Sequence, residues 1–106
     1  MAWMYLVIAG LFEIAWAIGL KYTEGFTRLW PSAGTVAAMI VSFLCLAESL
    51  KSIPVGTGYA VWTGIGAAGT ALMGILLFEE SRDLFRVVCI LTIVAAIAGL
   101  KLSSPA

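Results

Sequence analysis

The chain has 106 residues, of which 62% are hydrophobic and only 11% are charged. Soluble domains usually carry about 25% charged residues, so this composition predicts a single domain of an integral membrane protein. The net charge is zero and histidine is absent. These features argue against a nucleic-acid-binding surface and against the usual zinc and haem sites, so we expect no metal and no cofactor.

The first apolar stretch, residues 2–20, contains one charged side chain, Glu13, near its middle. A central acidic residue costs a membrane helix roughly 2.5–3.5 kcal/mol, whereas each Leu, Ile, Phe or Val favours insertion by roughly 0.3–0.6 kcal/mol. The stretch can therefore insert, but with little margin. Because ionisable groups inside a membrane usually mark a pathway, Glu13 is the main candidate for a proton- or cation-binding residue.

Gly10, Trp16 and Ala17 share a helix face with Glu13, since they lie three or four residues away from it. We expect Gly10 to leave room beside the carboxylate. Trp16 can donate its indole N–H to a carboxylate, and the face of its ring attracts cations. Two simpler interpretations stay open: Trp16 is an ordinary packing aromatic, or Glu13 is a protonated acid that joins two helices.

The second expected span covers about residues 32–48 and offers Ser42, with Met39 one turn earlier. A serine in a membrane helix often donates to the carbonyl four residues back, which here belongs to Ala38. The alternative interpretation is that Ser42 and Met39 line a substrate site.

The third expected span, about residues 55–78, carries three polar or aromatic side chains at helical spacing: Tyr59, Trp62 and Thr63. Their O–H and N–H groups can bond a carboxylate or orient a water molecule. Gly64 and Gly66 remove side chains from the middle of the span, which permits either close helix packing or a bend that acts as a hinge.

The fourth expected span, about residues 84–102, has only the uncharged residues Val87–Leu100 between Arg86 and Lys101. Ala95 and Gly99 form a small-xxx-small pair there, which suits contact with another helix. Cys45 and Cys89 lie inside apolar segments without C-x-x-C spacing, so we expect two small buried hydrophobic side chains and no disulfide.

Four short spans leave little interior for a solute pathway in one chain, so we expect an oligomer with its working cavity between subunits. The basic side chains divide weakly between the two sides of the membrane, with Lys51 and Lys101 opposite Lys21, Arg28, Arg82 and Arg86. Such a small bias sets orientation poorly, so insertion in both orientations is expected.

Over essentially its whole length, the sequence resembles the small multidrug resistance family of bacterial transporters. Three stretches carry the resemblance: E-x-x-W at Glu13–Trp16, LKYTEGFTRLWPS at Leu20–Ser32 and KSIPVGTGYAVWTGIGA at Lys51–Ala67. Trp16 and the WTGIGA motif at Trp62–Ala67 are similar to the guanidinium-exporter subtype, whereas the quaternary-ammonium exporters typically carry glycine and threonine near positions 16–17. Gly58 departs from the pattern, where alanine is usual, and is expected to loosen the start of the third span.

The resemblance implies an all-α membrane protein with four transmembrane helices per chain, assembled as an antiparallel homodimer in the bacterial inner membrane. It implies that both Glu13 carboxylates share a site for protons or one cation, surrounded by a network that we take to comprise Gly10, Trp16, Met39, Ser42, Tyr59, Trp62 and Thr63. It also implies a hinge at Gly64 and Gly66 and dimer contacts at Ala95 and Gly99.

These features favour a proton-coupled antiporter that exports guanidinium and small guanidinyl compounds. One alternative keeps the transporter and changes its cargo to hydrophobic quaternary ammonium or aromatic cations. Another is a structural subunit in which Glu13 only joins helices. An enzyme is the least favoured class, because the sequence shows no nucleophile–base pair and its other ionisable groups lie at the span ends.

Overall fold

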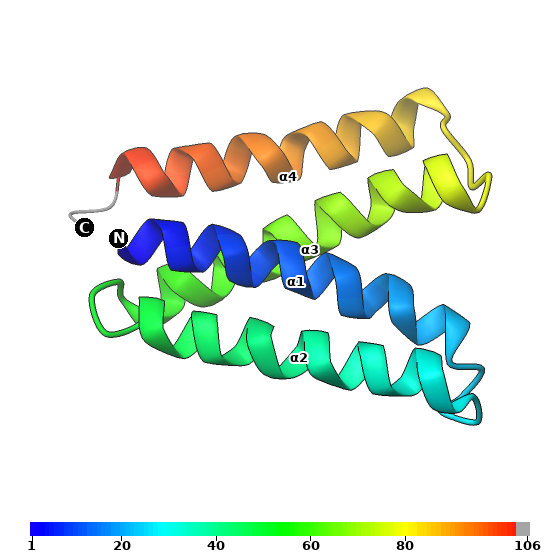
Figure 1. Cartoon of the computed structure of the whole chain (residues 1–106). Coiled ribbons are helices and arrows are strands. Elements are labelled where there is room, and N and C mark those ends of the chain that lie inside the picture. Colours follow the sequence, from blue (N-terminus) through cyan, green and yellow to red (C-terminus); the bar gives the residue numbers. More distant parts are fainter. Residues whose placement is uncertain (104–106) are drawn as a thin grey trace.

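The computed structural model describes residues 1–103 and contains four α-helices (Figure 1). The helices are α1 (Ala2–Tyr22), α2 (Leu29–Ser49), α3 (Val55–Leu77) and α4 (Leu84–Ser103). All four are long and apolar enough to cross a membrane, including α4, which has the highest mean hydropathy at 2.2. The predicted all-α membrane fold with four spans is therefore confirmed for the described residues.

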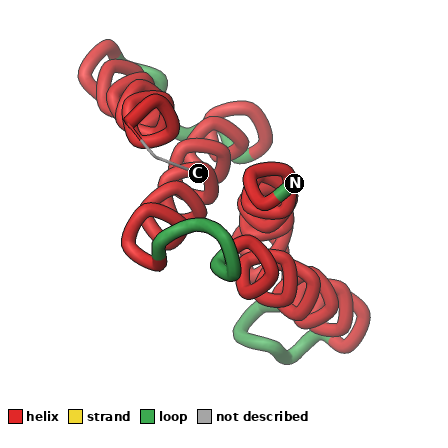
Figure 2. The backbone as a smooth tube through the Cα atoms, turned by 90° about the vertical axis from the view of Figure 1, so that its left-hand side faces the viewer, coloured by secondary structure: helices red, strands yellow, loops and turns green. Residues whose placement is uncertain are grey.

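The helices form a flat row rather than a closed bundle. Viewed along the helices, the order across the row is α4, α3, α1, α2 (Figure 2), and the molecule measures 43 × 35 × 17 Å. The backbone of α4 packs against α3 alone, and none of its residues is buried. A single chain therefore exposes most of the apolar surface of this helix.

The cysteines only partly match the expectation. Both are free thiols, as predicted, but Cys45 is half-buried and Cys89 is exposed on α4. The prediction of burial is wrong for Cys89, because α4 lies at the edge of the row and has a neighbour on one side only.

The buried apolar cluster lies toward the chain ends shown at the left of Figure 1 and joins α1, α3 and the α2–α3 connection. Its members are Leu6, Ala9, Ile53, Val61 and Trp62. Gly58 belongs to this region, since a Cβ atom there would overlap with the side chain of Leu50. Gly58 therefore admits the Leu50 side chain at the start of α3, and the expected loosening stays a prediction.

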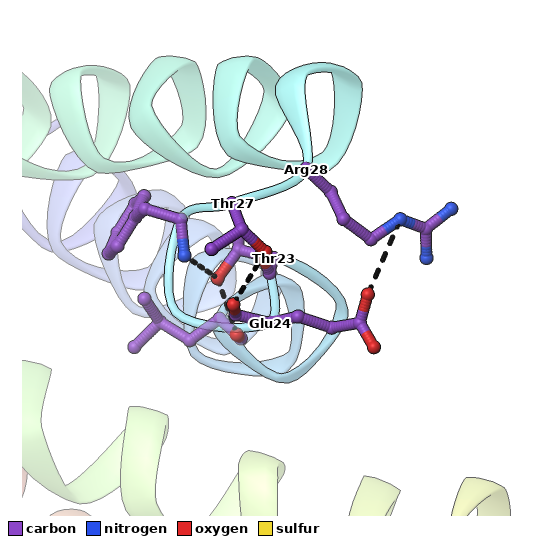
Figure 3. A network of polar contacts seen from close by, with 6 residues as sticks. Thr23, Glu24, Thr27 and Arg28 are labelled. Carbon is purple, nitrogen blue, oxygen red and sulfur yellow. Dashed lines mark hydrogen bonds and ion pairs between the residues drawn. The ribbon is translucent and has the colours of Figure 1, made fainter.

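An ordered turn connects α1 to α2 (Figure 3). The buried Thr23 hydroxyl donates to the Leu20 carbonyl at 2.8 Å and accepts the N–H of Phe26 at 3.2 Å. Glu24, Gly25 and Phe26 all have positive φ angles, so the chain reverses sharply within these residues. The turn reverses the chain, and α1 and α2 pack side by side.

Candidate cation-binding site

Glu13 projects from the middle of α1 toward α3 and lies against Gly66. A Cβ atom at Gly66 would overlap with Cδ and Oε1 of Glu13, so the carboxylate occupies space that only a glycine leaves free. Oε1 is buried and has no hydrogen-bond partner among the described residues. A buried carboxylate oxygen without a partner is costly, and it is relieved by a proton or by a cation that donates hydrogen bonds.

Glu13 lines a cavity of about 500 Å³ between α1 and α3. Thr63 and Thr70 also line it, and the Thr70 hydroxyl is buried without a partner among the described residues. The remaining wall is mostly small or apolar and runs to the C-terminal ends of both helices: Ala17, Ile18, Lys21, Gly66, Ala67, Ala71, Gly74, Phe78 and Glu80. The cavity thus extends from mid-membrane depth to the polar edge of the protein.

Ser42 ties three helices together. Its hydroxyl donates to the carbonyl of Ala9 in α1 at 2.6 Å and accepts the indole N–H of Trp62 in α3 at 3.0 Å. Ser42 thus bonds to the Ala9 carbonyl and not to that of Ala38, the simpler of the two interpretations, because a closely packed neighbouring helix offers a competing acceptor. In an α-helix the Ala9 carbonyl also accepts the backbone N–H of Glu13, so the network steadies the turn that carries the carboxylate.

We expect Ser42→Ala to lower the stability of the folded protein by roughly 1–3 kcal/mol, because it leaves the buried indole N–H of Trp62 without an acceptor. Thermal denaturation in detergent measures the change. Thr92→Ala is the matched control, since the exposed Thr92 hydroxyl bonds only to the Val88 carbonyl of its own helix. Equal melting temperatures for the two variants would contradict the role of the network.

Four aromatic rings form a continuous row across α1, α2 and α3. Trp16 meets Phe43 edge-on with ring centroids 6.3 Å apart, and Phe43 meets Trp62 in the same way at 5.7 Å. Tyr59 lies 5.6 Å from Trp62 and is largely exposed. Sequence reasoning missed Phe43, because nothing in the sequence except its place beside Ser42 distinguishes it from other apolar residues of the span.

The indole N–H of Trp16 is buried and has no partner among the described residues. Trp16 therefore does not donate to Glu13 within this chain, and its ring packs toward Phe43 of α2, in line with the interpretation of Trp16 as a packing aromatic. The expectation for Gly10 is wrong. A Cβ atom there would overlap with Ile65, so Gly10 allows close packing of α1 on α3 and does not leave space beside the carboxylate.

The other predicted site residues are distributed over several surfaces. Met39 is half-buried in α2, and Gly64 packs against Ile97 of α4. The helix is continuous through Gly64 and Gly66, so the hinge stays a prediction. Ala95 and Gly99 are both exposed on α4, where no described residue lies near the position that a Cβ atom would take at Gly99.

The cavity wall on α3 could have been found from the sequence. Thr63, Gly66, Thr70 and Gly74 recur every three or four residues, which places small and hydroxyl side chains on one helical face. The repeat of small residues identifies this face of α3. The prediction from sequence relied on the aromatic residues Tyr59 and Trp62 and so did not include Thr70 and Gly74.

Four apolar helices and a carboxylate-containing cavity define a small multi-pass membrane protein of the type that handles ions or small solutes. The family model described as Small Multidrug Resistance protein matches residues 1–93, and the chain belongs to this family. The predicted resemblance is thereby confirmed, and the protein is a multi-pass protein of the bacterial inner membrane.

The chain is similar to several bacterial proteins along its full length. It is 56% identical to the guanidinium exporter of Proteus vulgaris over 104 residues, which cover 98% of this chain and 100% of that protein. It is 60% identical to the guanidinium exporters of Escherichia coli (strain K12) and Citrobacter freundii, over 98% of this chain and 99% of each relative.

Proposed function

We propose that the protein is a proton-coupled antiporter that exports guanidinium and small guanidinyl compounds. The observation that carries the proposal is that Glu13 lines a cavity between two membrane helices and has one buried carboxylate oxygen without a partner among the described residues. The names of the similar proteins support guanidinium as the cargo.

The chemistry of a carboxylate supplies the coupling. A protonated carboxyl group is neutral and no longer pairs with a cation, whereas the ionised group accepts hydrogen bonds from one. Guanidinium is planar, carries N–H donors around its edge and binds a carboxylate through two parallel hydrogen bonds. Proton and cargo therefore exclude each other at Glu13, and alternate exposure of the site to the two sides of the membrane turns this competition into exchange.

An antiparallel homodimer completes the proposal. The exposed α4 gives each chain a large apolar face, and its Ala95 and Gly99 allow close approach of a second copy. Each subunit contributes one Glu13 to the shared site, and the glycines at 64 and 66 allow α3 to bend as access alternates.

The aromatic row favours a second candidate cargo. Trp16, Phe43, Trp62 and Tyr59 present ring faces and edges on three helices, and hydrophobic quaternary ammonium or aromatic cations bind to such surfaces through cation–π contacts. Quaternary ammonium cations have no N–H donors, so they make less use of the free oxygen of Glu13.

Purified protein in liposomes tests the assignment. We expect a guanidinium gradient to drive proton movement in the opposite direction, and we expect the KM for guanidinium to rise as the pH falls, because protons compete for the same carboxylates. A pH-sensitive dye inside the liposomes records the flux. Faster flux with a bulky aromatic cation than with guanidinium would favour the second cargo, and no flux with either would favour a structural role for Glu13.

A further inference from the structure

A second carboxylate, Glu80, lies at the outer end of the cavity that holds Glu13. The Gly74 carbonyl accepts the backbone N–H groups of Phe78 at 3.0 Å and of Glu80 at 3.2 Å, and Glu79 between them has a φ of 54°. This reversal folds the Glu80 side chain back along α3. A Cβ atom at Gly74 would overlap with the Glu80 carboxylate, so a glycine is what admits the group to the cavity wall.

The partner of this carboxylate is a guanidinium group. Arg86 Nη2 lies 2.7 Å from Glu80 Oε1, in a pair whose side chains are 34% and 46% exposed, respectively. Ion pairs that remain this accessible to water contribute little net stability, so a competing cation can exchange with one of the partners. The pair with Arg86 therefore shows that the Glu80 carboxylate can accept a hydrogen bond from a guanidinium group.

At the same end of the cavity, a second cationic side chain, Lys21, lies over an aromatic ring, that of Phe78. The Lys21 ammonium lies 4.8 Å from the centre of the Phe78 ring, and both residues line the cavity. At the outer end of the cavity, Glu80 and the Phe78 ring are therefore already paired with cationic side chains of the protein. At the inner end, no described cationic side chain pairs with Glu13.

We propose that Glu80 is an outer cation site for the cargo, at which a guanidinium-type cation takes the place of Arg86 before it moves inward to Glu13. The inference rests on the proposed function, which supplies the cargo. Its physical basis is that cargo and resident side chain have the same head group, so the carboxylate that fits one also fits the other. Arg86 keeps the site paired when cargo is absent and competes with cargo when it is present.

Initial rates of guanidinium-driven proton flux, measured in proteoliposomes over a range of guanidinium concentrations, test this site. We expect Glu80→Gln to raise the KM by roughly two- to fivefold at low ionic strength, with less effect in high salt and with the maximal rate close to that of the wild type. We expect Arg86→Gln to lower the KM, because it removes the competitor from Glu80. The double variant should behave like Glu80→Gln.

Two neighbours in the same connection provide matched controls. Glu79→Gln and Arg82→Gln make the same charge changes at exposed positions outside the cavity wall, and we expect both to keep the wild-type KM. If the Glu80–Arg86 pair has only a structural role, the loss of either partner should shift the KM in the same direction.

The outcomes separate the two proposals. A KM change of the same sign in Glu80→Gln and Arg86→Gln, or no change in either while the wild type transports guanidinium, would overturn the outer site and leave the proposed function standing. A wild type that moves no protons in response to guanidinium would overturn both. Size-exclusion profiles that match the wild type verify that each variant is folded.

Discussion

Glu13→Gln is expected to abolish guanidinium-driven proton flux. The substitution keeps the size and shape of the side chain but removes the group that binds both protons and cation. Hydrogen bonds to charged groups contribute roughly 1.5–3 kcal/mol, so guanidinium affinity should fall by about tenfold to a hundredfold. Coupling should be lost entirely, because an amide does not take up protons near neutral pH. Proteoliposome flux and guanidinium binding by the purified protein measure the two effects.

Glu48→Gln is the matched control for this experiment. Glu48 lies at the water-exposed end of α2, where it pairs with Lys51 at 3.2 Å. Because exposed ion pairs contribute roughly 0–1 kcal/mol, this variant should transport at close to the wild-type rate. Proton-coupled transport that persists in Glu13→Gln would defeat the assignment of Glu13, and a loss of stability without any transport defect would support the structural alternative.

Gly66→Ala is expected to impair both stability and transport. The added methyl group overlaps with the carboxylate of Glu13, so either the carboxylate leaves its position or α1 and α3 move apart. Overpacking of this kind typically costs about 1–3 kcal/mol. We expect a lower melting temperature in detergent and a reduced maximal flux in liposomes, measured on the same preparation.

Gly56 of α3 provides the control that distinguishes the effect of packing from the effect of helix propensity. Apart from its chain neighbours and the nearby backbone of α3, a methyl group added at Gly56 would have no atom within 4 Å, so Gly56→Ala places a side chain in open space. Alanine stabilises a helix interior relative to glycine by roughly 0.5–1 kcal/mol and contributes less in the first turn, where Gly56 lies, so this variant should be about as stable as the wild type. Wild-type flux and stability in Gly66→Ala would show that the carboxylate does not depend on this contact.

The candidate site was only partly predictable from the sequence. Glu13 is identifiable because an isolated charge in an apolar run is a local feature with a known energetic cost. Trp62 and Ser42 are both predicted as site residues, but their mutual bond could not be foreseen, since they lie 20 residues apart in sequence. The role predicted for Gly10 is wrong, because helical spacing gives the face of one helix without saying which side chain of the next helix fills it.

Four membrane helices, with one carboxylate deep among them, follow from the amino-acid sequence alone, because the length of an apolar run and the isolation of a charge are properties of contiguous residues. Three contacts emerge only from the folded chain: Ser42 bonds to α1, Gly66 receives the Glu13 carboxylate, and Glu80 pairs with Arg86 beside the cavity. These contacts depend on how each helix is rotated about its axis and on how the connections fold back. Packing between helices sets the first two contacts, which join residues far apart in the sequence, whereas the third depends on how the α3–α4 connection folds back.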